Sequence, residues 1–151
     1  MTKLWRLCSG VVLSFFMCGA LIGAAQTRMS DKDVENMMKN LKDDAGNFRS
    51  NFNSAVGKST IRGTDQEKQA KTLVQSFQKQ TEVMLDQFKD KKKADAELAT
   101  VRSSADQIDK LLASTPMGDK VATNWSKVKS ELGTISSAFG TDNQQAATSA
   151  K

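Results

Sequence analysis

Apolar side chains recur along most of the chain at alternating steps of three and four residues, with polar residues between them. This spacing matches the helical period and predicts amphipathic helices, each with one apolar face. Four such runs predict helices over residues 31–56, 65–89, 95–113 and 116–139. Helices of this length are marginal alone in water, so their apolar faces must pack together. We therefore expect an all-α domain over residues 30–140, an antiparallel up-down-up-down four-helix bundle.

The residues expected in the core are those that keep the helical spacing within each run. They are Val34, Met38, Leu41, Ala45, Phe48, Phe52 and Val56; Ala70, Leu73, Phe77, Met84 and Phe88; Leu98, Val101, Ala105, Ile108 and Leu112; and Val121, Trp125, Val128, Leu132, Ile135 and Phe139. One polar residue, Thr81, shares the second register. Its hydroxyl can bond a carbonyl of its own helix or help to fix the register, and we favour the first interpretation.

Capping patterns mark the first two helix starts. Ser30 with Asp33, and Thr64 with Glu67, have the spacing of a capping box. The fourth helix is expected to start with Thr115 as its cap and proline at the first helical position. Gly140 is expected to end it.

The boundary between the second and third helices lacks a Gly or Pro over residues 89–97. Phe88 and Leu98 would keep a heptad phase if one helix continued. That helix would, however, place Lys91 and Asp95 successively on the buried seam, which is costly. We favour a corner over a long unbroken helix.

The two ends of the chain differ from the bundle. Lys3 and Arg6 precede an apolar stretch, Leu7–Ile22, and small residues follow it up to Ala25. These parts predict a secretory signal peptide over residues 1–25, followed by a linker over 26–29 and export to the periplasm or beyond. At the other end, residues 141–151 are small and polar without a period, which predicts a disordered tail.

Two alternatives to a cleaved signal fit the sequence less well. Leu7–Ala25 spans 19 residues, close to the length of a membrane-spanning anchor, but its Ser and Gly content and its small-residue end favour cleavage. A membrane association is expected only if the segment stays uncleaved. A lipoprotein is disfavoured because bulky residues precede both Cys8 and Cys18.

Composition excludes several kinds of function. The chain has no His and no Tyr, and both cysteines lie in the predicted signal peptide. After cleavage, 20 basic residues face 17 acidic ones, so the net charge is +3, too small to indicate nucleic-acid binding. With no thiol, imidazole or phosphate-binding glycine loop, we expect no catalytic residue, no metal ligand and no cofactor, and the core must hold without disulfides.

The lysine run Lys89, Lys91, Lys92 and Lys93 is the one candidate binding feature. Its lysines could contact an anion such as a phospholipid headgroup, an envelope polymer or an acidic protein. They could equally offset the dipole at a helix carboxyl end and solvate a corner, which we favour.

Two acid pairs, Asp43 with Asp44 and Asp106 with Asp109, could do acid–base chemistry in a pocket. Nothing in the sequence indicates such a pocket, so we expect neither pair to be a site.

Several motifs resemble a group of small exported bacterial helical proteins that have a signal peptide, four helices and no assigned function. The similar positions are Phe48-Arg49, Gly63-Thr64-x-x-Glu67, Phe77 to Thr81, Ile108-Asp109, Trp125 and Ala138-Phe139. This chain departs from the group at Asn124, where Asp is usual, at Phe139, where Tyr is usual, and in its second corner, which lacks a Ser cap. The resemblance implies the fold and carries no functional residue.

Together these features predict a non-enzymatic envelope protein, a structural or interaction module with a protein or envelope partner. The alternative is a periplasmic chaperone-like binder of unfolded or acidic proteins, which would need an exposed apolar concavity ringed by lysines.

Overall fold

The computed structural model describes the backbone of residues 29–148 and the side chains of residues 29–140. Its elements are four helices: α1 Asp31–Val56, α2 Asp65–Lys91, α3 Asp95–Ser114 and α4 Asp119–Thr148. The prediction of an all-α four-helix bundle is confirmed. The predicted signal peptide and most of the linker lie outside the described residues.

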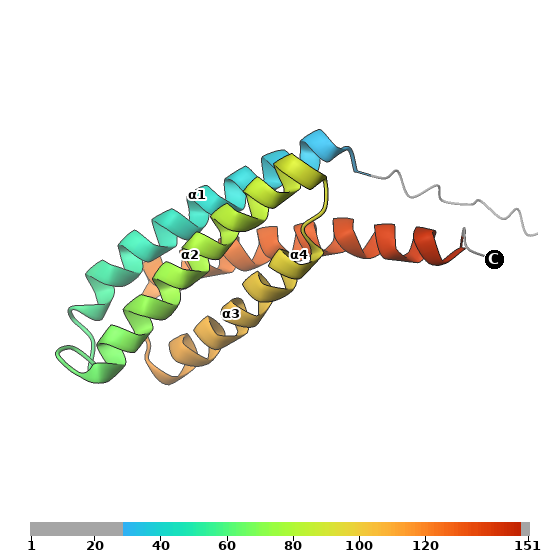
Figure 1. Ribbon diagram of the computed structural model, residues 1–151. Helices are drawn as coiled ribbons and strands as arrows, with labels where there is room; N and C mark the ends of the chain where they lie inside the picture. The colour runs from blue at the N-terminus through green and yellow to red at the C-terminus, as the bar shows by residue number, and fades with distance from the viewer. Residues whose placement is uncertain (1–28, 149–151) are drawn as a thin grey trace, which may run out of the picture.

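Consecutive helices run in opposite directions, joined by short loops (Figure 1). α1 packs against both α2 and α4, and α2 packs against α3; among the four neighbouring pairs, α3 and α4 have the smallest contact. α4 is therefore held in the bundle mainly through α1.

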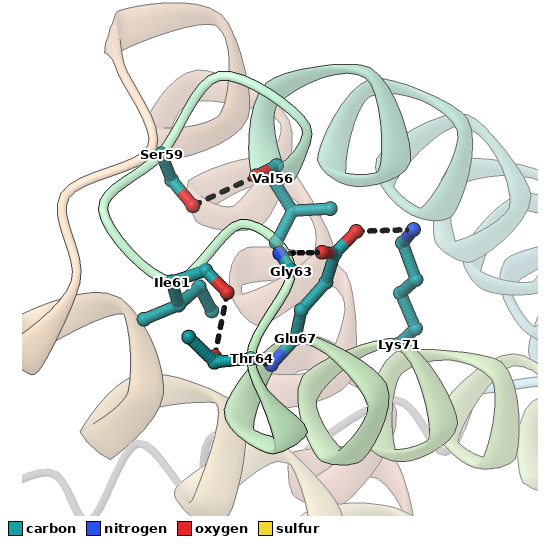
Figure 2. A network of polar contacts seen from close by, with 7 residues as sticks. All are labelled: Val56, Ser59, Ile61, Gly63, Thr64, Glu67 and Lys71. Carbon is teal, nitrogen blue, oxygen red and sulfur yellow. Dashed lines mark hydrogen bonds and ion pairs between the residues drawn. The ribbon is translucent and has the colours of Figure 1, made fainter.

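The loop between α1 and α2 is closed by the predicted capping residues, which Figure 2 shows. The Thr64 hydroxyl accepts a hydrogen bond from the Glu67 N–H and donates one to the Ile61 carbonyl. Oε2 of Glu67 accepts from the Gly63 N–H at 2.6 Å, and its Oε1 pairs with Lys71 at 2.6 Å. These two donors lower the pKa of Glu67, Lys71 more than Gly63. Gly63 itself has φ +75°, a conformation that glycine adopts without strain.

The corner between α2 and α3 exists as predicted. Lys92 has φ 54° and ψ 24°, the left-handed conformation that ends many helices, and its N–H donates to the Phe88 carbonyl. It is the one residue other than glycine with positive φ in the described part of the chain. The next helix begins after Ala94, which offers no side-chain cap.

The predicted start of the fourth helix is wrong. Thr115 follows the end of α3, where its N–H donates to the Leu111 carbonyl, instead of capping α4. Pro116 lies in the loop, and α4 begins three residues later. Gly118, with φ +85°, makes this possible because its reversed backbone turns the chain so that its carbonyl accepts the Ala122 N–H.

The predicted end of the fourth helix is also wrong. α4 passes through Gly140 and continues to Thr148, so most of residues 141–151, expected to be a disordered tail, prolongs the helix. Glycine inside a helix costs about 1 kcal/mol relative to alanine but does not block the hydrogen-bond ladder as proline does. Gly140 was therefore a weak stop signal, and the alanines and glutamines after it favour a helix.

The core matches the predicted faces of α1 and α4 in full. In α2, Val74 is buried instead of Leu73, which packs at the edge of the core. The reason is that the inward face of this helix follows residues 70, 74, 77 and 81. Leu112, near the end of α3, is likewise only partly buried. Thr81 is fully buried, and its hydroxyl donates to the Gln78 carbonyl at 2.7 Å, as favoured from the sequence.

Candidate functional site

The lysine run lies at the α2–α3 corner, where its four side chains are exposed. The Lys92 ammonium lies 4.0 Å from Oε2 of Glu35 on α1 and 5.6 Å from the centroid of the Phe88 ring. Lys89 lies 3.9 Å from Oδ1 of Asp86. Two of the four lysines are therefore already paired with groups of the bundle.

Acidic residues share this end of the molecule. Exposed Asp90 interrupts the lysine run and exposed Asp95 follows it, and Asp31 in the first turn of α1 lines the same cavity as Lys92. The positive charge is thus balanced locally, so the geometry favours a role for the lysine run in ending α2 over one in binding an anion.

The structure separates the two members of each acid pair considered in the sequence. Asp106 is exposed on α3, whereas Asp109 points toward α4. There Oδ1 of Asp109 accepts from Nε1 of Trp125 at 2.7 Å and from the Lys129 ammonium at 2.9 Å. Partial burial alone would raise the pKa of Asp109, but the Trp125 and Lys129 hydrogen bonds outweigh it and the pKa is lowered. This contact joins α3 to α4.

Asp44 likewise separates from Asp43 and turns toward α4. Its Oδ2 lies 2.7 Å from the Lys127 ammonium, and its side chain is only 13% exposed. Glu131, one turn after Lys127, also forms a hydrogen bond with Asp44, and so does the Asn47 side chain. Three ionisable groups from two helices therefore meet at the α1–α4 interface.

The charges of these three groups are interdependent. Burial would raise the pKa of Asp44, but hydrogen bonds with Lys127 and Glu131 lower it. Burial, together with the neighbouring Asp44 carboxylate, raises the pKa of Glu131 to about 7. The hydrogen bond to Asp44 raises the pKa of Lys127. Glu131 is therefore the group whose charge changes closest to neutral pH.

Sequence reasoning missed this cluster. Lys127 and Glu131 are spaced as an ordinary helical ion pair, and Asp44 lies 83 positions away from Lys127. One signal was available: Glu131 directly precedes the core residue Leu132, so its side chain must lie at the edge of the apolar face.

The surface also carries a groove of about 340 Å³ between α2 and α3, lined by Ser76, Lys79, Gln80, Val83, Glu97 and Thr100. Val83 is 44% exposed, and besides Met29, which precedes α1, it is the only large apolar side chain exposed in the described part of the chain. The groove therefore combines an accessible apolar side chain with a flanking lysine and glutamate.

Among the described side chains, no three acidic, His or Cys groups gather as metal ligands would. None of the described helices combines the length and the apolar character needed to cross a membrane.

Comparison of the chain with protein-family models, with curated proteins and with solved structures finds no match.

Proposed function

We propose that the protein is an exported, non-enzymatic module of the bacterial envelope, and that it binds one protein partner in the groove between α2 and α3. The observation that carries this proposal is Val83, exposed on a helix whose other large apolar side chains face inward. An isolated exposed valine is common, but here it lines a concave surface, which increases the apolar area a partner can cover.

The groove also indicates the chemistry of the partner. Lys79 on α2 and Glu97 on α3 both line it. A segment that inserts an apolar side chain against Val83 and places an acid near Lys79 and a base near Glu97 would complement the groove. Charges at the rim contribute more to specificity than to affinity.

The chaperone-like alternative has less support. It needs a broad apolar concavity ringed by lysines, whereas the bundle buries its apolar faces and the groove includes one lysine. Export is supported by the amino-terminal pattern of Lys3, Arg6 and the apolar stretch that follows. Mass spectrometry of the mature protein from the envelope should find an amino terminus near Gln26, and an intact terminus would favour the anchor.

Site-specific photocross-linking tests the proposed binding. A photoreactive phenylalanine analogue replaces Val83 in the full chain, expressed in its own cells, and a matched variant carries it at Ser130, which is exposed on α4. We expect one cross-linked product at position 83 that is absent at position 130. Val83→Lys should abolish binding of the identified partner while the helical content stays unchanged.

Three outcomes would contradict the proposal. Products from many unrelated proteins at position 83 would favour the chaperone-like alternative. Equal products at both positions would show that the groove is not the binding surface. No product at either position, in cells that contain the protein at its natural level, would argue against a stable protein partner.

A further inference from the structure

The acid pair Asp44 and Glu131 lies where α1 and α4 pack against each other, and a buried oxygen of this pair lacks a hydrogen-bond donor. Oε2 of Glu131 is buried, and no N–H or O–H donor in the described part of the chain reaches it. A buried carboxylate oxygen without a donor is costly. The group that does reach Glu131 is the Asp44 carboxyl, and two carboxyls can share a hydrogen bond only if one of them is protonated.

The neighbouring charges decide which carboxyl holds that proton. Asp44 accepts from the Lys127 ammonium through both oxygens, at 2.7 and 2.9 Å, and from Asn47. These donors stabilise the ionised form of Asp44. Glu131 has no comparable donor and faces an ionised neighbour, so it is the one that carries the proton.

The groups that act on the pair come from the two helices that it joins: Asp44 and Asn47 from α1, and Lys127 and Glu131 from α4. Lys129, which pairs with Asp109 of α3, lies two residues from Lys127, about 200° around the helix. The acid pair and its lysine therefore form a separate unit at the α1–α4 interface.

We propose that the acid pair makes the α1–α4 contact sensitive to pH: a proton shared by Asp44 and Glu131 joins the two helices, and its loss places two negative charges against each other and loosens α4. Because α4 touches α3 least, α1 is its main support, and repulsion there acts on the helix as a whole.

The direction of the pH effect follows from the protonation of Glu131. Its pKa is about 7 in the folded protein and near 4.5 without the fold. Between these values the folded state binds the extra proton, so stability falls as the pH rises from about 4.5 to 7 and then levels off. Other acids with lowered pKa values, such as Asp44 and Asp109, change stability at lower pH and in the opposite direction.

Thermal unfolding of the full chain at a series of pH values tests the proposal. We expect the melting temperature of the wild type to fall by roughly 3–6 °C between pH 5 and 8. Glu131→Gln, which keeps the shape of the protonated acid and can still donate to Asp44, should remove most of that fall. Asp44→Asn should also reduce it. The control is Asp106→Asn, an exposed acid on α3, which should keep the wild-type profile.

A second measurement asks whether α4 loosens. In a Trp5→Phe background, Trp125 of α4 is the only tryptophan, and its ring is 3% exposed. Acrylamide quenching of its fluorescence should rise between pH 5 and 8, and Glu131→Gln should prevent the rise. Unchanged quenching together with an unchanged melting temperature would overturn the proposal, and so would a pH profile that Glu131→Gln does not alter.

Discussion

One aspartate on each neighbouring helix forms hydrogen bonds with α4, Asp109 on α3 and Asp44 on α1. The two aspartates differ in their partners. On the α3 side, both partners of Asp109, the Trp125 N–H and the Lys129 ammonium, are hydrogen-bond donors. On the α1 side, Asp44 accepts from Lys127 but also faces Glu131, itself an acid. The first contact is therefore complete near neutral pH, whereas the second depends on one further proton.

The number of hydrogen bonds between two helices therefore does not by itself determine how their contact depends on pH. α4 has its larger contact with α1, yet that side contains the group most sensitive to pH. The smaller contact with α3 contains the hydrogen bond from the Trp125 N–H and an ion pair with Lys129. Substitutions on the two sides should therefore differ in how their effects depend on pH as well as in size.

Trp125→Ala should have the largest effect. The ring lies with its centroid 4.8 Å from that of Phe48 and 5.4 Å from that of Phe77, so it joins α4 to α1 and α2 as well as to Asp109. Its removal should lower the free energy of unfolding by about 3–5 kcal/mol, measured by urea unfolding. Trp125→Phe is the control: it keeps a ring and loses the donor, and should cost less. A loss below about 1 kcal/mol for the alanine variant would contradict this position of the ring.

Asp109→Ala should come next. It leaves the Trp125 N–H without its acceptor and should cost about 1–2 kcal/mol at pH 7. Because the pKa of Asp109 is lowered by the fold, its contribution is present above the normal pKa of 3.8 and is lost as the pH falls further. The cost, followed by urea unfolding, should therefore be constant from pH 5 to 8 and shrink toward pH 3. A cost that changed between pH 5 and 8 would remove the contrast with the α1 side.

Gly133→Ala should strengthen α4 without touching either contact. No atom lies within 4 Å of where its Cβ would be, and alanine favours a helix over glycine by about 1 kcal/mol. We expect a gain of about 0.5–1 kcal/mol that is the same at pH 5 and pH 8, measured by thermal unfolding. A gain at only one pH would indicate that the residue is coupled to the acid pair after all.

Lys127→Met should have the smallest effect on stability but a distinctive effect on pH dependence. The Lys127 side chain is itself exposed, although that of its partner Asp44 is not, so its removal should cost less than the substitutions above. Lys127 lowers the pKa of Glu131, so its removal should raise that pKa and move the loss of stability to higher pH. Lys129→Met, on the α3 side, is the matched control and should leave the pH profile in place. The same shift in both variants would mean that net charge, rather than the local contact, governs the profile.

Most of the fold was predictable because it depends on local patterns. The faces of α1 and α4 and the capping box at Thr64 follow from residues three or four positions apart, within reach of one helical turn. The errors occurred where a sequence signal for a helix end was weak or was compatible with two structures. Pro116 is as well suited to a loop as to a first helical turn, and Gly140 lowers the stability of a helix without ending it.

The acid pair was not predictable in the same way. Asp44 was noticed only as the neighbour of Asp43, and Glu131 and Lys127 have only the spacing of an ordinary helical ion pair. Their meeting depends on the register between α1 and α4, which the periodicity of each helix alone does not specify. The exposed Val83 was also missed, since its contribution depends on the position of α3 beside it.

The 83 positions between Asp44 and Lys127 also bear on the order of folding. α1 and α2, and α2 and α3, are joined by short loops, so their contacts close with little loss of chain entropy, whereas joining α4 to α1 closes a loop that includes both other helices. We expect α4 to dock last. Changes at Asp44 or Lys127 should then alter mainly the rate of unfolding and leave the rate of refolding nearly unchanged.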